Sequence, residues 1–155
     1  MAETTSVVIR PGRPGEGPRL KEIAILSKAH WGYGLDEVRA WADRGDFSPE
    51  QLRRLAVFVA EAGHVEIGWA SLERRQEVWW LADLWVLPDW IRRGVGSRLF
   101  RRAETYARDQ GGRRLEWEAE PNSVGFYEKM GARQLRESGS EWGRTLSVMG
   151  IELDG

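Results

Sequence analysis

The sequence predicts an α/β (α+β) fold, in which a mixed central sheet of about 6–7 strands is flanked by about four helices. In the first half, strand-like runs follow one another across short turns, which is typical of antiparallel hairpins. In the second half, strand-like and helix-like runs alternate, which is typical of strand–helix–strand units. We therefore expect a single domain over residues 1–155, with its core at about 7–153.

The periodicity of apolar residues places the individual elements. The expected strands cover residues 7–9, 55–60, 64–72, 78–87, 115–119, 132–137 and 146–153. The expected helices run from residue 20 to the glycines at 32 and 34, over 36–44, over 95–110 and over 121–129. Residues 48–54 begin like a helix but are short, and 10–18 and 138–144 are expected to be loops. The run 78–87 is nearly continuously apolar, which is typical of a strand buried on both faces.

Composition indicates an ordinary globular chain that is long enough for a sizeable core, with 41% hydrophobic and 30% charged residues. A net charge of −1 favours neither nucleic acid nor an anionic membrane as a partner. The absence of cysteine excludes disulfides and thiolate nucleophiles and fits a reducing compartment. Two histidines without a paired spacing give no metal site. No signal peptide or membrane-spanning run is visible, so we expect a cytoplasmic protein.

A glycine loop between a strand and a helix is the feature around which the chain is organised. The apolar strand ends at Pro88, and the loop then reaches Gly94-Val95-Gly96, where a helix begins. Glycines let a backbone approach a ligand, and the N–H groups of a helix's first turn bind phosphate. The loop lacks the P-loop pattern, and Leu99 replaces the third glycine of a dinucleotide fingerprint. It therefore predicts either a phosphate site or a tight turn that binds nothing.

Two segments resemble the GNAT superfamily of acyl-CoA-dependent N-acetyltransferases. The family loop reads Arg/Gln-x-x-Gly-x-Gly/Ala after a Val-x-Pro-like segment, and Val86-Leu87-Pro88 and Gly94-Val95-Gly96 match it, whereas Ile91 departs at its first position. The segment from Asn122 to Ala132, with Phe126-Tyr127-Glu128-Lys129 inside it, is similar to the second family signature. The resemblance covers roughly residues 7–153 and implies the GNAT (acyl-CoA N-acyltransferase) fold.

The resemblance also implies a binding site for acetyl-CoA as the acyl donor. Backbone N–H groups of the loop would hold the pyrophosphate, from residues Arg92, Arg93, Gly94, Val95, Gly96 and Ser97. The backbone of Leu84, Trp85 and Val86 would pair with the pantetheine arm. Asn122 would bind the same arm, cap the next helix, or do both. Arg98, Arg101 and Arg102 lie beside the loop as further phosphate ligands or as a solvated helix face.

Tyr127 and Asp83 are the catalytic candidates. A phenol is protonated at neutral pH, and the resemblance implies that Tyr127 donates its proton to the departing thiolate; the alternative is a core aromatic. Asp83 is the only charge within the run 78–87, where desolvation raises a carboxyl pKa toward that of a base. Its alternative is a structural carboxylate. Ala82 stands where polyamine-acetylating relatives carry a glutamate, so a water relay, or Glu73, Glu118 or Glu120, also remains open.

The acceptor pocket is expected at the break between the first two helices. His30, Trp31 and Tyr33 place an imidazole, an indole and a phenol within four residues, as pocket lining or as ordinary packing. Ser140, Trp142 and Arg144 are candidates for an opposite wall.

These observations predict an enzyme that transfers an acetyl group from acetyl-CoA to a primary amine of a small molecule or protein. The alternative is an acyl-CoA-binding module without catalysis. A nucleic-acid binder is disfavoured by the balanced charge. The acceptor is not indicated by the sequence, and a homodimer is left open.

Overall fold

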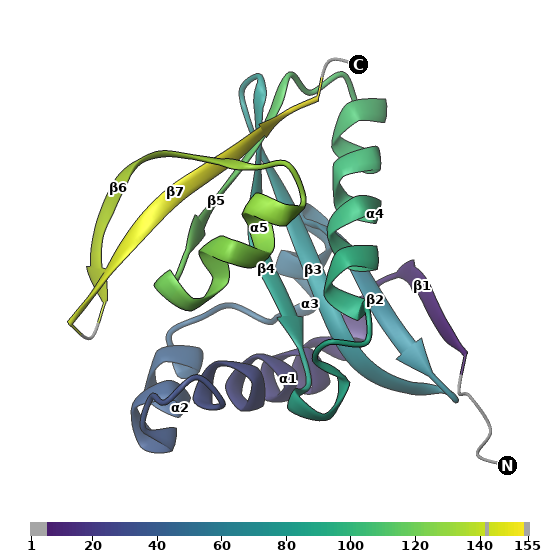
Figure 1. The fold of residues 1–155 in the computed structure, drawn as a ribbon. Coiled ribbons are helices and arrows are strands. Elements are labelled where there is room, and N and C mark those ends of the chain that lie inside the picture. The colour runs from purple at the N-terminus through teal and green to yellow at the C-terminus, as the bar shows by residue number, and fades with distance from the viewer. Residues whose placement is uncertain (1–5, 142, 154–155) are drawn as a thin grey trace, which may run out of the picture. The chain divides into compact units, whose positions relative to one another are not determined.

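The computed structural model describes residues 6–141 and 143–153 and combines helices and strands in the order that Figure 1 shows. The strands are β1 (Val7–Pro11), β2 (Ala56–Ala62), β3 (Val65–Arg75), β4 (Val78–Val86), β5 (Arg114–Ala119), β6 (Arg133–Glu141) and β7 (Arg144–Glu152). The α-helices are α1 (Gly17–Ala29), α2 (Leu35–Asp43), α3 (Pro49–Arg54), α4 (Val95–Asp109) and α5 (Val124–Lys129). Short 3-10 helices are η1 (Pro14–Glu16), η2 (Pro88–Trp90) and η3 (Pro121–Ser123).

The strands form one mixed sheet in the order β1-β2-β3-β4-β5-β7-β6, which confirms the predicted fold class. The β1–β2, β5–β7 and β6–β7 pairs are antiparallel, and β4 pairs with β5 in parallel. The parallel register joins Val78–Trp80 to Arg114–Glu116, whereas β4 itself continues to Val86.

The described chain has five α-helices where about four were expected, because the short segment after Ser48 is helical. The Ser48 Oγ accepts a hydrogen bond of 3.2 Å from the Gln51 N–H, and Pro49 occupies the first turn. A capping hydroxyl and an early proline together stabilise a helix start. The start signal was therefore visible in the sequence, and only the shortness of the run argued against it.

The chain divides into two compact units. Unit 1 comprises Met1–Ser71 and Asp83–Ala103, and unit 2 comprises Leu72–Ala82 and Glu104–Gly155.

The core of unit 1 lies between α1 and the strands β2 and β3. On α1, the residues Leu20, Ile23 and Ala24 recur at helical spacing and are fully buried. They pack in one cluster with Trp69 of β3, whose Nε1–H donates to the Leu20 carbonyl oxygen over 2.8 Å. Figure 1 shows α2 beside α1 in this unit. The indole of Trp69 thus contributes apolar area and also satisfies its own buried polar atom.

Gly68 of β3 allows a close approach of three elements within unit 1. A Cβ atom at this position would lie 2.8 Å from the Trp85 carbonyl oxygen and 3.3 Å from Leu99 Cδ1. The Leu87 N–H donates to the Ile67 carbonyl oxygen over 2.9 Å, so the end of β4 is fixed on β3 at the same level. Any side chain larger than hydrogen at position 68 would push β4 or α4 away.

In unit 2, β6 and β7 form an antiparallel hairpin that is longer than predicted (Figure 1). The prediction of a loop over 138–144 is wrong for most of its length, since β6 reaches Glu141 and β7 begins at Arg144. Register shifts between Gln134 and Arg136 and between Glu137 and Gly139 interrupt the ladder. These irregularities break the strict alternation of apolar and polar residues by which a strand is recognised in a sequence.

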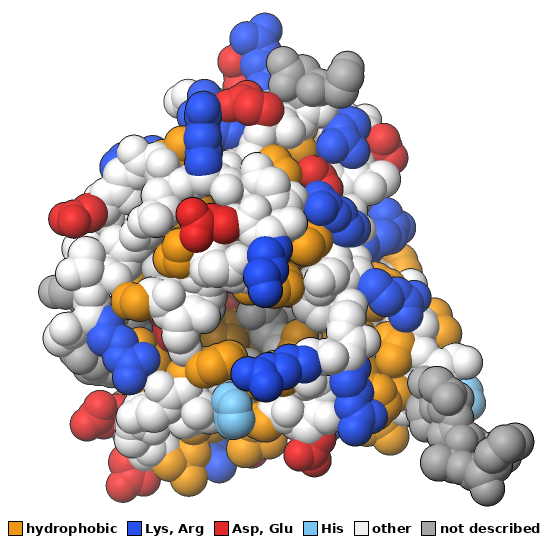
Figure 2. Space-filling view, viewed as in Figure 1, with side chains coloured by type: hydrophobic (Ala, Val, Ile, Leu, Met, Phe, Trp, Pro, Cys, Tyr) orange, Lys and Arg blue, Asp and Glu red, His pale blue; other side chains and the backbone are white. Residues whose placement is uncertain are grey.

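The face drawn in Figure 2 carries side chains of both charges in several separate places. This distribution agrees with the near-neutral net charge of −1. Within the described chain, no helix is both long enough and apolar enough to cross a membrane.

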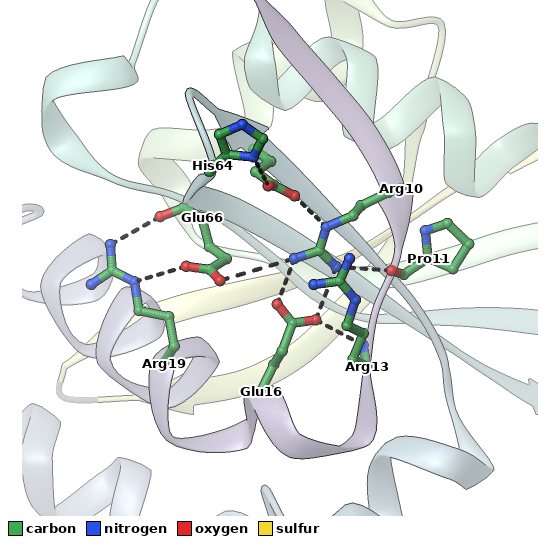
Figure 3. A network of polar contacts seen from close by, with 8 residues as sticks. Arg10, Pro11, Arg13, Glu16, Arg19, His64 and Glu66 are labelled. Carbon is green, nitrogen blue, oxygen red and sulfur yellow. Dashed lines mark hydrogen bonds and ion pairs between the residues drawn. The ribbon is translucent and has the colours of Figure 1, made fainter.

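Arg10 of β1 is the centre of a polar network in unit 1 (Figure 3). Its guanidinium donates to both carboxylate oxygens of Glu16, over 3.0 and 2.6 Å, and also to the carboxylate of Glu61 on β2. Glu66 of β3 lies 3.9 Å from the same guanidinium and is itself contacted by Arg19. The hydrogen bond from Arg10 lowers the pKa of Glu16 and that of Glu61 below their ordinary value.

We expect Gly68→Ala to lower the free energy of unfolding by about 1–3 kcal/mol, the usual cost of overpacking. The measurement is urea denaturation followed by circular dichroism. Gly15→Ala is the matched control, because a Cβ at position 15 meets no heavy atom of the described chain within 4 Å. Equal stability of the Gly68 variant and the wild type would contradict the tight approach.

We expect Arg10→Gln to make the stability of the fold depend less steeply on pH in the acid range. Carboxyl groups whose native pKa is lowered contribute stability above about pH 4.3, and this contribution is lost as the pH falls through the native pKa. The melting temperature of the wild type should therefore fall more steeply between pH 6 and pH 3 than that of the variant. Arg39→Gln, which breaks an exposed pair with Glu22, should leave the slope unchanged.

Candidate functional site

The glycine loop follows directly from the anchored end of β4 in unit 1. After Val86 the chain forms η2, in which the Trp90 N–H donates to the Leu87 carbonyl oxygen and the Ile91 N–H to that of Pro88. Proline at the start of this turn fixes its direction. The loop is thus held at its beginning by β3 and at its end by α4.

The backbone of the loop combines two left-handed residues with the N-terminus of a helix. Arg92 and Gly94 both have left-handed conformations, with φ of 66° and 81°. Turns of this kind direct successive N–H groups toward one point. The α4 helix begins at Val95, and its first bond runs from the Arg98 N–H to the Gly94 carbonyl oxygen over 3.1 Å. The N–H groups from Val95 to Ser97 therefore point out of the helix, where the helix dipole favours negative charge.

The charged side chains around the loop also favour a negatively charged ligand. The first turn of α4 contains no acidic residue. Arg92 and Arg93 are exposed beside the loop, and the Arg93 guanidinium lies 5.0 Å from the ring centre of Trp90. The arrangement can bind a phosphate or pyrophosphate group.

The three arginines of α4 beside the loop, Arg98, Arg101 and Arg102, make contacts within unit 1. Arg98 Nη1 donates to the Val7 carbonyl oxygen over 2.7 Å, and the Arg102 guanidinium lies 4.6 Å from the Phe58 ring centre. Arg101 is exposed, with its guanidinium 5.7 Å from the Phe100 ring centre. These contacts favour a structural role for Arg98 and Arg102.

Asp83 on β4 is partly buried and accepts two hydrogen bonds. Ser71 Oγ of β3 donates to Oδ2 over 2.6 Å, and Trp85 Nε1 donates to Oδ1 over 3.0 Å. Burial raises the pKa of Asp83 above its ordinary value, whereas the two hydrogen bonds act in the opposite direction. Both predicted alternatives for Asp83, a base and a tie between strands, are compatible with this geometry.

Lys28 is a buried lysine that the sequence reading did not single out. Its ammonium nitrogen lies 4.6 Å from the ring centre of Trp41, 5.3 Å from that of Tyr33 and 5.8 Å from that of Trp85. Lys28 follows Ala24 by four residues, so it occupies the buried face of α1. A lysine at a core position of an amphipathic pattern was the signal that could have found it.

The three acceptor candidates separate in the structure. His30 and Trp31 are exposed and contact each other edge to face, with ring centres 5.0 Å apart. Tyr33 is buried in a cluster with Ile25, Val38 and Ala42. Of the opposite-wall candidates, Trp142 lies outside the described residues, and Arg144 starts β7.

Tyr127 is buried on α5 in unit 2. Its ring centre lies 4.8 Å from that of Trp117 on β5 and 5.0 Å from that of Phe126. Burial raises the pKa of the phenol well above its ordinary value, and the charge of Glu120 adds to the effect. The hydroxyl is therefore protonated throughout the physiological range, as a proton donor requires.

Asn122 is exposed on η3 and does not cap α5. The N-cap residue of α5 is Ser123, which makes no side-chain capping bond, so the predicted capping role is wrong. Unit 1 thus contains Asp83, Leu84, Trp85, Val86, the loop and the acceptor candidates, and unit 2 contains Asn122 and Tyr127.

Comparison with known proteins gives a family match and several solved N-acetyltransferases of the same fold. The profile of the Acetyltransferase (GNAT) family matches residues 22–132. The PaiA N-acetyltransferase from Thermoplasma acidophilum, solved in complex with coenzyme A, is 21% identical with a TM-score of 0.79, over 95% of this chain and 99% of its own. The ribosomal-protein-S18-alanine N-acetyltransferase from Escherichia coli is 15% identical with a TM-score of 0.73, over 97% and 96%.

A third structure, the putative acetyltransferase yncA from Salmonella typhimurium with its cofactor acetyl-CoA, is 21% identical with a TM-score of 0.73, over 97% and 96%. The search of curated proteins found no match. At these identities the solved structures establish the fold.

Proposed function

Because the chain belongs to the Acetyltransferase (GNAT) family, we propose that it transfers the acetyl group of acetyl-CoA to a primary amine of a small molecule or protein. The observation that carries the proposal is the loop from Arg92 to Ser97, whose left-handed residues and helix N-terminus fit a pyrophosphate. Because it belongs to this family, the protein is an acyltransferase. We propose in addition how it binds acetyl-CoA and that its acceptor is a primary amine.

The coenzyme would be held mainly by the backbone. The N–H groups of the loop would bind the pyrophosphate, with Arg92 and Arg93 beside it. The β4 strand extends past its register with β5, and the backbone of Leu84, Trp85 and Val86 would pair with the pantetheine arm. Asn122 is the side chain proposed to bind the same arm. Acetyl-CoA supplies an activated thioester, which an amine can attack directly.

Two side chains would handle the protons. Asp83 would accept a proton from the acceptor ammonium, directly or through water, so that the nitrogen lone pair becomes available. Tyr127 would donate its hydroxyl proton to the departing thiolate, which its raised pKa keeps available. The acceptor ammonium loses two protons on becoming an amide: the first passes to Asp83 and on to solvent, and the second, lost from nitrogen after the attack, replaces the proton that Tyr127 gives to the thiolate. The carbon–sulfur bond breaks as the carbon–nitrogen bond forms, and one proton is released overall. No covalent intermediate on the protein is required, which agrees with a chain without cysteine.

The acceptor would approach from the α1–α2 junction. His30 and Trp31 are exposed there and can contact an incoming amine. Tyr33 is buried, and its ring would support the pocket by packing on the Lys28 ammonium.

Gly94→Val is expected to weaken acetyl-CoA binding about ten- to hundredfold. A branched residue in a left-handed conformation costs about 1–3 kcal/mol, and the loop would relax away from the binding geometry. The measurement is isothermal titration calorimetry, with circular dichroism to show that the variant is folded. Gly125→Ala is the control, since a Cβ there meets nothing in the described chain within 4 Å. Unchanged affinity in a folded variant would contradict the loop assignment.

Tyr127→Phe is expected to reduce kcat about 10²–10⁴-fold and to leave acetyl-CoA binding intact, because only the hydroxyl is lost and the ring contacts remain. Release of free thiol measures the rate, and calorimetry measures the binding. Tyr106→Phe on α4, whose ring packs on Trp79, is the matched control. An unchanged kcat would contradict the role of Tyr127, whereas binding without turnover for any amine would favour the non-catalytic module.

A further inference from the structure

Both oxygens of the Asp83 carboxylate are engaged by donors from two adjacent strands. Ser71 Oγ, on β3, lies 2.6 Å from Oδ2, and Trp85 Nε1, on β4, lies 3.0 Å from Oδ1. Ser71 is fully buried, so its hydroxyl is confined by the core. We call this arrangement, formed by Ser71, Asp83 and Trp85, the carboxylate clamp. Because the two bonds act on different oxygens, they fix the plane of the carboxyl group.

The Trp85 ring is itself held in place. It contacts Trp41 of α2 edge to face, with ring centres 5.6 Å apart, and packs against the unit 1 core. On α1, the ammonium of Lys28 lies 5.8 Å from the Trp85 ring centre, within the range of a cation–π interaction. The indole therefore cannot turn away from Asp83 without breaking contacts with two helices.

The chemistry of the clamp depends on the protonation state of Asp83. An indole N–H is a donor only, whereas a serine hydroxyl both donates and accepts. A protonated carboxyl would have to turn its own hydroxyl toward Ser71 or toward another acceptor, and could not donate to Trp85. The ionised carboxylate satisfies both donors and keeps further lone pairs for an incoming proton. Within the described chain, both hydrogen bonds at this carboxyl come from donors, which is a poor arrangement for a neutral structural carboxyl.

We propose that Ser71 and Trp85 are positioning residues, which hold Asp83 ionised and in a fixed orientation as the base that deprotonates the acceptor amine. This inference rests on the proposed function and deepens it. Neither residue touches the substrate through its clamp atoms, since those atoms bind Asp83. The pKa of Asp83 is raised by burial and lowered by these two bonds, so the clamp limits the effect of burial. The Lys28 ammonium lies 5.8 Å from the Trp85 ring centre and 5.3 Å from that of Tyr33.

The first test is the pH dependence of kcat/KM for the wild type, Ser71→Ala and Trp85→Phe. Loss of either donor destabilises the ionised form, so the acid limb should move to higher pH by about one unit. At a pH on the wild-type limb this shift equals about a tenfold loss of activity, which should recover as the pH is raised. Trp41→Phe is the matched control, since it alters the same aromatic cluster without removing a bond to Asp83, and its acid limb should stay in place.

The second test does not depend on activity. The indole N–H signal of Trp85 in a ¹H–¹⁵N spectrum, assigned by its loss in Trp85→Phe, should shift as Asp83 titrates. In Asp83→Asn the signal should no longer respond over that pH range. Thermal melts show whether each variant is folded. If Ser71→Ala does not fold, the comparison of the wild type with Asp83→Asn still tests whether the Trp85 indole senses the charge of Asp83.

The outcomes separate this inference from the proposed function. A titrating indole together with acid limbs that move in both variants supports the clamp. An indole signal that does not titrate, or that still titrates in Asp83→Asn, overturns it even if the wild type acetylates amines. Acid limbs that stay in place overturn the positioning role and leave the acetyltransferase activity standing. A wild type that is inactive with every amine overturns the proposed function and the base role, while the indole signal still reports whether the clamp exists.

Discussion

The attachment of β4 to β3 is the constraint on which the rest of unit 1 depends. The missing side chain at Gly68 lets the Trp85 carbonyl and Leu99 approach, and the bond from the Leu87 N–H to the Ile67 carbonyl ends the strand at the same level. The loop therefore begins from a fixed point, and α4 begins where its first turn can meet a ligand. The same attachment brings Ser71 against Asp83, because adjacent strands place their side chains opposite one another. One close contact between two backbones thus underlies both the anion site and the candidate base.

The roles proposed for Asp83 and Tyr127 place opposite demands on burial. Burial raises the pKa of both groups. For a phenol that must keep its proton, this effect is sufficient by itself. For a carboxylate that must accept a proton, the same effect works against ionisation at rest, and hydrogen-bond donors are needed to limit it. Ser71 and Trp85 supply these donors to Asp83, and the ring of Tyr127 packs against those of Trp117 and Phe126.

Much of the fold follows from local patterns, and the exceptions have physical reasons. The loop at Gly94 and the helix after it were predictable, because a strand, glycines and an apolar helical stripe succeed one another within a short stretch. The extension of β6 to Glu141 was not, since its register shifts remove the alternation that marks a strand. Ser71 and Lys28 were missed for another reason. Periodicity places Lys28 at a core position of α1, but spacing along the chain reveals neither its partner Trp85 nor the partner of Ser71, which is Asp83.

The anion recognition proposed for the loop depends on backbone N–H groups, which every amino acid except proline carries. The N–H groups at the start of α4 are neutral and do not titrate, so their capacity to bind is the same in weakly acidic and weakly alkaline solution. Side chains in this region are consequently free to drift as long as the backbone keeps its turns. An isoleucine at position 91, where the family pattern has arginine or glutamine, is such a drift. The chain shares only 15–21% of its residues with the PaiA and ribosomal-protein-S18-alanine N-acetyltransferases and still has the same fold.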